Sequence, residues 1–181
     1  MIWLKFLFWP LRQIDALLPR QGLILDLGCG DGTVATYLAK RSPRRQIIGL
    51  DIHPPRSPGL PNLVFKTQNI LQADFRPAAG CVLSDCLHHL SPPQQQLLLE
   101  RLSRRLKAGS VLVIKEIDRD NMIRSKLSRV WDWLLYPQDK INYYSAPELI
   151  SAMKKLHFKV KYQPVSWWFP GSVNLFVCAK Q

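Results

Sequence analysis

Residues 23–34 read LILDLGCGDGTV, a short apolar run that breaks into alternating glycines and then resumes a helical pattern. The apolar run predicts a buried strand. Gly28, Gly30 and Gly32 predict a sharp turn in which the backbone can approach a ligand closely, because glycine has no Cβ. The stretch therefore predicts a strand, a ligand-binding turn and a helix start, which together form the first unit of an open α/β sheet.

An acidic residue closes the second apolar run of the chain. Residues 46–51 read QIIGLD, so Asp51 follows the glycine turn by about twenty residues. A carboxylate at the end of this strand can accept hydrogen bonds from both hydroxyls of a ribose. The two features together predict an adenosine-containing ligand at the carboxyl edge of the sheet. The dinucleotide fingerprint G-x-G-x-x-G is not matched, because the chain has Thr33 where the third glycine would stand.

The run from Asp26 to Gly32, DLGCGDG, resembles the first motif of the class I S-adenosylmethionine-dependent methyltransferases, (D/E)xGxGxG. The resemblance implies S-adenosyl-L-methionine as the cofactor. It also implies a Rossmann-like, doubly wound α/β sheet of seven strands, mostly parallel, with the last strand antiparallel. The implied cofactor-binding residues in this part of the chain are Asp26, Gly28, Cys29, Gly30, Gly32, Asp51 and Ile52. On the alternative interpretation, the glycines only form a tight strand-to-helix turn.

The rest of the chain alternates between strand and helix patterns, as expected of a single domain over residues 1–181. We expect strands near residues 23–27, 46–51, 62–66, 80–84, 110–116, 158–164 and 173–179. Capping boxes with an early proline, at Ser91 and Ser145, predict helices that run to about residues 107 and 156. Residues 1–19 form an amphipathic N-terminal segment. Residues 119–144 are too long for a plain connection, which predicts a substrate-side insertion.

The resemblance implies two further cofactor contacts after the third strand, where the chain reads Gln68-Asn69-Ile70. In related enzymes an acid or amide here contacts the adenine edge, and the next backbone amide bonds a ring nitrogen. These roles pass to Asn69 and Ile70. Asn69 is equally well interpreted as an ordinary turn residue.

The fourth strand ends in residues 84–90, SDCLHHL, which resembles the D-x-L-H-H run of many small-molecule methyltransferases, including those acting on quinones and lipids. The resemblance, to a small bacterial type of the family, implies that Asp85 lines the methionine end of the cofactor. Enzymes that methylate amino groups of DNA and RNA usually carry (N/D)PP(Y/F) at this place. The absence of that motif disfavours a nucleic-acid substrate.

His88 and His89 are adjacent in this run. Adjacent residues on a strand or helix cannot both face one point, so we expect no two-histidine metal site. One histidine is expected to pack or cap. The other is expected to face the pocket, where a near-neutral imidazole could take a proton from an acceptor hydroxyl. Both therefore stand as candidate catalytic residues.

Ionisable residues also end the fifth strand, in the order Lys115-Glu116-Ile117-Asp118. Alternation along a strand predicts that Lys115 points one way and that Glu116 and Asp118 point the other. Charged groups at this depth must be paired. On the functional interpretation, Glu116 or Asp118 positions the methyl acceptor, with Lys115 holding an anionic group. On the structural interpretation, an internal salt bridge pins the insertion. We take Glu116 as the third candidate catalytic residue.

The formal net charge is +12, although six of the 13 carboxylates lie in or beside the cofactor motifs. The remaining surface is thus even more basic, which favours anionic partners such as acidic lipids, nucleic acid or a negatively charged substrate. The four cysteines form no CxxC pair and no zinc-like cluster. No segment reaches the roughly 18 apolar residues of a membrane span, and no signal-peptide cleavage site is apparent. We therefore expect a reduced cytoplasmic protein without a metal.

All six tryptophans lie in flanking segments, namely Trp3, Trp9, Trp131, Trp133, Trp167 and Trp168. Residues 122–136 combine apolar residues at helical spacing with basic ones, and residues 2–9 read IWLKFLFW. This composition is typical of interfacial segments. We therefore expect peripheral contact with the inner face of a membrane. The alternative is that these segments fold over each other as a lid above a small-molecule pocket.

The main hypothesis is an enzyme that transfers a methyl group from S-adenosyl-L-methionine to a small, lipophilic or amphiphilic acceptor. The second is an RNA methyltransferase that uses the basic surface. The third is a non-catalytic module that keeps the cofactor as a structural ligand. The acceptor atom and the oligomeric state stay open.

Overall fold

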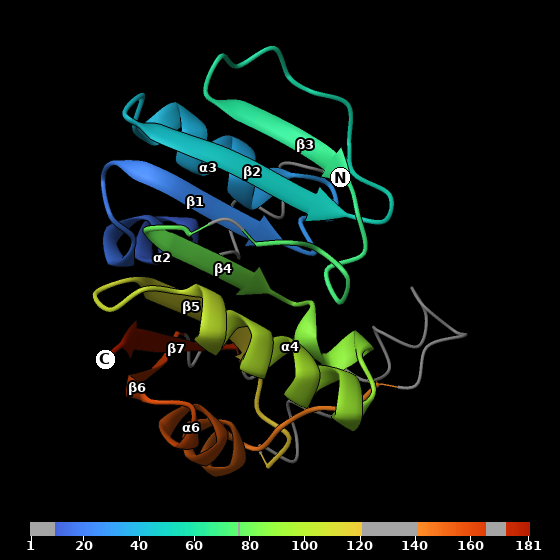
Figure 1. Ribbon diagram of the computed structural model, residues 1–181, viewed down its shortest axis with the longest axis vertical. Coiled ribbons are helices and arrows are strands. Elements are labelled where there is room, and N and C mark those ends of the chain that lie inside the picture. The colour runs from blue at the N-terminus through green and yellow to red at the C-terminus, as the bar shows by residue number, and fades with distance from the viewer. Residues whose placement is uncertain (1–9, 76, 121–140, 166–172) are drawn as a thin grey trace.

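The computed structural model describes residues 10–75, 77–120, 141–165 and 173–181 (Figure 1). Within these ranges, seven strands form one sheet in the order β3-β2-β1-β4-β5-β7-β6. Three predicted features lie outside the described residues. They are the first nine residues of the N-terminal segment, the amphipathic stretch of the insertion, and all six tryptophans.

The strands are β1 (Gly22–Leu27), β2 (Arg45–Asp51), β3 (Leu63–Thr67), β4 (Gly80–Ser84), β5 (Val111–Ile117), β6 (Phe158–Pro164) and β7 (Val173–Lys180). Strands β3, β2, β1, β4 and β5 pair in parallel, whereas β7 is antiparallel to both of its neighbours, β5 and β6. This order confirms the predicted doubly wound sheet with an antiparallel last strand. Every strand boundary lies within about one residue of the predicted one, which shows how strongly apolar runs mark buried strands.

The middle of the sheet is buried on both faces. All five residues of β4 are buried, and β1 and β5 each contain a run of at least four buried residues. A strand covered on both sides needs an almost continuous apolar sequence, which is what these three strands have. The outer strands β3 and β6 instead expose much of their length.

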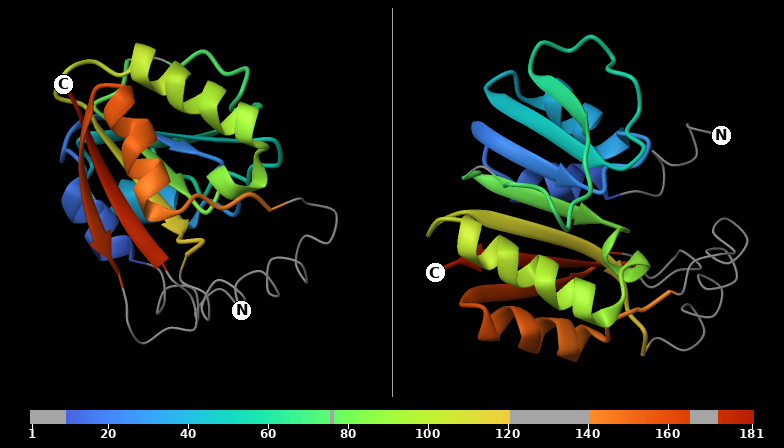
Figure 2. Two further views of the ribbon diagram at one scale, coloured as in Figure 1. Left: turned by 90° about the horizontal axis from the view of Figure 1, so that it is seen from below. Right: turned by 45° about the vertical axis from the view of Figure 1, so that its right-hand side comes forward.

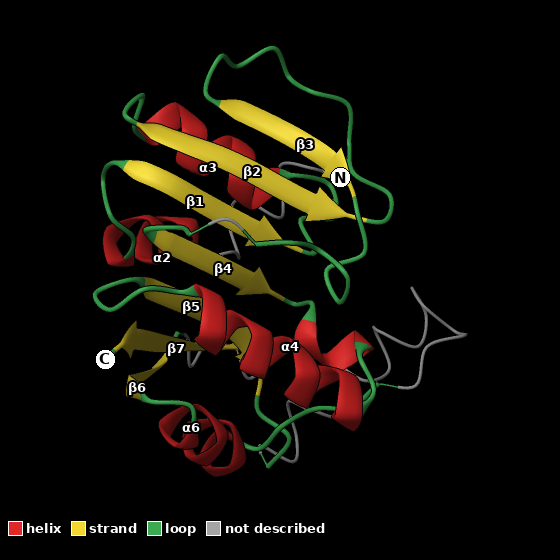
Figure 3. Cartoon of the chain, viewed as in Figure 1, coloured by secondary structure: helices red, strands yellow, loops and turns green. Residues whose placement is uncertain are grey.

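Helices cover the two faces of the sheet (Figures 2 and 3). One face carries α2 (Leu11–Leu17) and α3 (Thr33–Arg41), which pack on Ile24, Val82 and Val113. The other carries α4 (Pro92–Arg105) and α6 (Ala146–Lys155), which pack on Leu25, Leu83 and Ile114. A short 3-10 turn, η1 (Leu87–His89), follows β4. Alternate residues of each central strand thus contribute to two separate cores.

The predicted capping boxes are present at the starts of α4 and α6. The backbone N–H of Ser91 donates to the side chain of Gln94, and that of Ser145 donates to Glu148, each over 2.9 Å. These bonds satisfy donors that a helix start otherwise leaves unpaired. Among the helices of the described ranges, none has the length and apolar character needed to cross a membrane.

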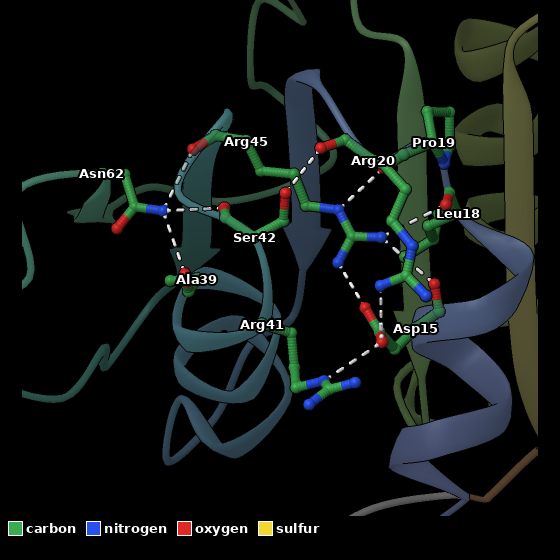
Figure 4. A network of polar contacts seen from close by, with 9 residues as sticks. All are labelled: Asp15, Leu18, Pro19, Arg20, Ala39, Arg41, Ser42, Arg45 and Asn62. Carbon is green, nitrogen blue, oxygen red and sulfur yellow. Dashed lines mark hydrogen bonds and ion pairs between the residues drawn. The ribbon is translucent and has the colours of Figure 1, made fainter.

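Arg45, at the start of β2, is completely buried and holds the end of α2 against the sheet (Figure 4). Its guanidinium donates to the backbone carbonyls of Pro19, Leu18 and Asp15, and also to the carboxylate of Asp15. Burial alone would raise the pKa of Asp15, but hydrogen bonds from Arg45 and Arg20 outweigh it and lower that pKa. Removing one partner of a buried pair typically destabilises a protein by about 3–5 kcal/mol, so this network fixes the amino end of the sheet.

Candidate active site

The glycine turn is held tightly against the end of β2. The backbone N–H groups of Gly28 and Cys29 both donate to Leu50 O, over 2.8 and 3.1 Å. The turn then closes on itself through a bond from Gly32 N to Cys29 O. Gly28, Gly30 and Gly32 all have positive φ, at 69°, 49° and 73°. Residues with a Cβ rarely adopt this conformation, which explains the three glycines at the level of the backbone.

The surroundings of the three glycines differ. A Cβ at Gly28 would lie 2.2 Å from Cys86 Sγ, and one at Gly32 would lie 2.5 Å from the ring of Phe65. A Cβ at Gly30 would meet nothing within 4 Å. Gly28 and Gly32 are therefore required by packing, whereas Gly30 borders open space. This is the arrangement expected where a backbone cradles a ligand.

Asp51 lies beside this open space, at the end of β2. Its Oδ2 accepts from Gly30 N and its Oδ1 accepts from His53 N, both over 2.9 Å. Each carboxylate oxygen has two lone pairs, so each can still accept one more hydrogen bond, as a ribose diol would require. The next residue, Ile52, is 61% exposed and offers an apolar surface at the same edge. The site therefore fits the nucleoside part of the predicted cofactor.

Asn69 and Ile70 follow β3 at this edge. Asn69 is exposed, and its Oδ1 accepts from Leu71 N over 2.9 Å, while its carbonyl accepts from the backbone of Gln72 and Ala73. Asn69 thus does form a turn, and its side-chain amide N–H groups remain chemically suited to an adenine edge. Ile70 is buried in the core on the α4 face.

Asp26 links the strand before the glycine turn to the helix after it. It is buried in β1, and its Oδ2 accepts from Ala35 N in the first turn of α3 over 3.0 Å. Burial raises the pKa of Asp26 to about 7, and the negative charges of Asp51 and Asp31 act in the same direction, while the Ala35 bond opposes them. Asp26 therefore ties strand to helix rather than facing the open side of the turn.

Asp85, directly after β4, has a left-handed backbone with φ at 51°. Its backbone N–H donates to Lys115 O over 3.0 Å, and its carboxylate pairs with the ammonium of the buried Lys115. Lys115 is thus engaged in an internal salt bridge with the end of the neighbouring strand β4 and not with the insertion. Backbone strain in a residue other than glycine persists only where the surroundings impose it, and it is concentrated at functional sites.

His88 and Glu116 form a second buried pair, on the α4 side of the sheet. His88 Nδ1 lies 2.7 Å from Glu116 Oε2, and Glu116 Oε1 accepts from Leu87 N over 2.8 Å. A carboxylate only accepts, so this bond places a proton on Nδ1 and makes Nε2 the proton acceptor of the neutral ring. Lys115 and Glu116 therefore point to opposite faces, as alternation predicts.

The two histidines differ in their surroundings, as expected for neighbours in a turn. His88 is 3% exposed and packs against the ring of Tyr143, with 5.1 Å between centroids. His89 is only partly buried. The backbone N–H of Asn142 donates to His88 O over 2.8 Å. This bond brings the end of the predicted insertion to the histidine turn.

The residues that begin the insertion are bonded to the start of α6, the helix that follows the insertion. Oδ1 of Asp118 accepts from Ala146 N over 3.2 Å, and Arg119 forms an ion pair with Glu148 over 2.8 Å. Hydrogen bonds from the Ser145 backbone and then from Arg119 lower the pKa of Glu148. Asp118 thus anchors the start of α6 through a hydrogen bond to the backbone.

Sequence analysis did not single out Ser84, the last residue of β4. Its Oγ is buried and, among the buried side-chain oxygens and nitrogens of the described residues, it alone has no hydrogen-bond partner. Ser84 pairs in register with Lys115 and directly precedes Asp85. A buried hydroxyl without a partner is unfavourable unless a ligand or ordered water satisfies it. It supports a ligand at the carboxyl end of β4.

The strand order, the glycine turn and the acid that ends β2 define a Rossmann-like protein that binds an adenosine-containing ligand at its carboxyl edge. The family model described as "Methyltransferase domain" matches residues 6–163, and the chain belongs to this family. The prediction of a class I S-adenosylmethionine-dependent methyltransferase is thereby confirmed, and so is its cofactor, S-adenosyl-L-methionine.

Characterised relatives agree with this family. The chain is 32% identical over 117 residues to trans-aconitate 2-methyltransferase of Deinococcus radiodurans, covering 59% of this chain and 43% of that one. It is 33% identical over 107 residues to carboxy-S-adenosyl-L-methionine synthase of Pectobacterium atrosepticum, covering 52% and 43%. The alignments span less than half the length of these two relatives.

Solved structures share the fold. The 1,6-didemethyltoxoflavin-N1-methyltransferase of Burkholderia thailandensis, with bound 1,6-didemethyltoxoflavin and S-adenosylhomocysteine, matches with a TM-score of 0.75 at 19% identity. The match covers 94% of this chain and 77% of that one. Human N-acetylserotonin methyltransferase, in complex with S-adenosylmethionine, matches with a TM-score of 0.72 at 17% identity, covering 94% and 51%.

The raised pKa of Asp26 predicts a specific pH dependence of stability. Between about pH 4 and 7, the folded state keeps the Asp26 proton while the unfolded state releases it, so the contribution of Asp26 to the free energy of unfolding decreases as pH rises. Asp26→Asn keeps an oxygen acceptor for Ala35 N but removes the titration. In urea unfolding, the free energy of unfolding of the variant should rise relative to that of the wild type by an amount on the order of 3 kcal/mol between pH 4 and 7.

Asp74→Asn is the matched control, because the Asp74 side chain is 80% exposed. This variant should follow the wild-type pH dependence. Parallel curves for Asp26→Asn and wild type would show that the folded state does not raise the pKa of Asp26.

Proposed function

We propose that this protein transfers the methyl group of S-adenosyl-L-methionine to a small-molecule acceptor. The observation that carries the proposal is the open side of Gly30, where the bare backbone of the turn lies next to the Asp51 carboxylate at the carboxyl edge. Backbone without side chains and a carboxylate with spare lone pairs suit a ribose and an amino-acid chain, and require no phosphate-binding group.

The remaining cofactor roles follow from the position of each residue at this edge. Asp51 would accept from the ribose hydroxyls, and Ile52 would cover the adenine. Asn69 and the backbone of Ile70 would contact the adenine edge. Asp85 and the Ser84 hydroxyl would lie at the methionine end, after β4. Asp26, Gly28, Cys29 and Gly32 would act through the shape of the turn.

When bound, the cofactor supplies an electrophilic methyl carbon on a positively charged sulfur. A nucleophilic acceptor atom forms a bond to that carbon as the carbon–sulfur bond breaks, and the bonding pair stays on sulfur to give S-adenosylhomocysteine. Holding the acceptor in line with that bond supplies much of the rate enhancement. An acceptor hydroxyl must also lose its proton as the methyl group is transferred. A base is therefore needed only for such an acceptor, and it must lie within reach of that proton.

We assign the role of base to His88, because Glu116 fixes its ring and leaves Nε2 as the proton acceptor. Glu116 itself is a positioning residue, since it also accepts from the backbone of Leu87 and so holds the whole turn in place. The ring of His89 stacks beside that of His88, with 4.3 Å between centroids, and we assign His89 a packing role there.

We further propose that residues 1–181 form one domain in which the insertion, residues 119–144, faces the acceptor. The support is the contact of Asn142 with His88 and the anchoring of Asp118 beside Ala146. A lipophilic or amphiphilic acceptor, reached at the inner face of a membrane from the cytoplasm, is favoured by the tryptophan-rich, basic composition of the flanking segments. The trans-aconitate 2-methyltransferase relatives make an acidic small molecule the second acceptor class to test.

Gly30→Ala should weaken cofactor binding without unfolding the protein. The added Cβ would clash with no protein atom but would enter the open space beside the turn, and the left-handed backbone would add about 1–2 kcal/mol of strain. We expect titration calorimetry with S-adenosylhomocysteine to show affinity reduced at least about tenfold, equivalent to 1.4 kcal/mol.

Gly109→Ala is a closely matched control. Gly109 also has positive φ and open surroundings, but it lies in the turn between α4 and β5, at the opposite edge of the sheet. Its variant should bind S-adenosylhomocysteine as the wild type does. Equal affinity in both variants would place the cofactor elsewhere.

With a phenolic acceptor, His88→Ala should lower kcat by about 10²- to 10⁴-fold, because the leaving proton loses its base. Glu116→Gln should lower kcat less and shift the acidic limb of the pH–rate profile, since the amide cannot stabilise a protonated imidazole. His89→Ala serves as the control and should stay near wild type. Transfer of radiolabelled methyl groups to a panel of phenols, hydroquinones and carboxylic acids measures these effects. A loss confined to His89→Ala would contradict the assignment.

A further inference from the structure

A hollow lies between α2 and α3, on the edge of the sheet where the parallel strands begin. Its volume is about 560 Å³, and it is lined by Arg12, Asp15, Ala16, Arg20, Tyr37 and Arg41. This volume is within the range of small-ligand sites, roughly 300–1,000 Å³. The hollow is at the opposite edge from the glycine turn, so the proposed methyl transfer makes no use of it.

The hollow carries an excess of positive charge. Its lining contains three arginines and one carboxylate, Asp15. That carboxylate is already engaged, because Oδ1 accepts from the buried Arg45 and Oδ2 accepts from Arg20 over 2.9 Å. Arg41 also approaches Oδ2, over 3.5 Å. One carboxylate therefore contacts three guanidinium groups, and Arg12 adds a further positive charge to the lining, which leaves the site attractive to an anion.

The guanidinium groups of Arg20 and Arg41 are also held in place. They come from different elements, the loop before β1 and the end of α3, yet both meet Oδ2 of Asp15 (Figure 4). Their side chains remain 59% and 56% exposed, so most of their N–H donors face solvent. A guanidinium presents five N–H donors, of which each of these two uses one on Asp15. Because both guanidinium groups are bonded to the same carboxylate oxygen, they lose less conformational entropy when a ligand binds.

Neighbouring side chains extend this donor set. Tyr37 precedes Arg41 by four residues on α3, and Arg12 precedes Asp15 by three on α2, so each lies one turn along the same helix face. Tyr37 and Arg12 line the hollow from its two walls, and the side chains of both carry further hydrogen-bond donors. Planar guanidinium forks match the oxygens of a phosphate group, which carries up to two negative charges in a small volume.

We propose that this hollow binds a phosphate-bearing ligand through Arg20, Arg41 and Arg12, with Asp15 and Arg45 acting only to position the guanidinium groups. The site does not depend on the proposed methyl transfer. It provides a second place at which a phosphorylated small molecule, or the headgroup of a phospholipid, contacts the protein.

The test compares the wild-type chain, residues 1–181, with an Arg20→Gln/Arg41→Gln double variant. Asp15 keeps its bonds to Arg45 in this variant, so we expect it to fold, which circular dichroism and thermal unfolding would check. One arm titrates inorganic pyrophosphate at a roughly physiological ionic strength of about 0.15 M. The other arm measures co-sedimentation with vesicles of phosphatidylcholine and phosphatidic acid in equal parts.

The matched control is Arg104→Gln/Arg105→Gln. These arginines are 68% and 57% exposed, pair with Glu100 and Asp74, and lie at the end of α4. This control variant therefore removes the same amount of positive charge as the Arg20/Arg41 variant, from the same edge of the sheet. We expect binding in at least one arm to weaken at least about tenfold in the Arg20/Arg41 variant and less than about threefold in the control.

The arm in which this difference appears identifies the source of the phosphate group, free in solution or on a lipid surface. Equal weakening in the two double variants would show that only net charge matters and would overturn the site. Absence of binding to the wild type in both arms would overturn it as well.

Discussion

The close approach of the glycine turn to the ends of β2 and β4 is the constraint on which the site depends. Because Gly28 has no side chain, the turn can lie against Cys86, and its amides can reach Leu50 O. This position brings the Gly30 amide to Asp51 and keeps the open side of the turn facing outward. The edge where β1, β2 and β4 end thereby gathers backbone donors, a carboxylate with spare lone pairs and the unsatisfied hydroxyl of Ser84.

Much of this arrangement could be predicted from the sequence because it is local. Buried strands require continuous apolar runs, so their limits were predictable within about one residue, and the capping boxes at Ser91 and Ser145 mark helix starts by side-chain chemistry alone. The ranking of His88 above His89 could not be predicted, because it depends on Glu116, which is 28 residues away and reaches the turn only in the folded sheet. The same holds for Asp15 and Arg45, which are 30 residues apart.

Charge is divided between the two edges of the sheet. Carboxylates of the cofactor motifs lie at one edge, where Asp85 forms an ion pair with Lys115 and Glu116 accepts a hydrogen bond from His88. Arginine and lysine side chains instead end α3, α4 and α6, where they also complement the negative ends of the helix dipoles. Six of the basic side chains that contribute to the net charge of +12 therefore lie at the opposite edge from the site. This separation lets one small domain offer a cofactor site and a basic surface independently.

The central claim is that the turn of Gly28, Gly30 and Gly32 binds S-adenosylmethionine and not a dinucleotide. The most direct measurement is calorimetric titration of the wild-type chain, residues 1–181, with S-adenosylhomocysteine and, in parallel, with NAD. The account predicts micromolar binding of S-adenosylhomocysteine and none of NAD, because the chain has Thr33 where a dinucleotide site has its third glycine. Preferential binding of NAD, or binding of neither ligand, would contradict it.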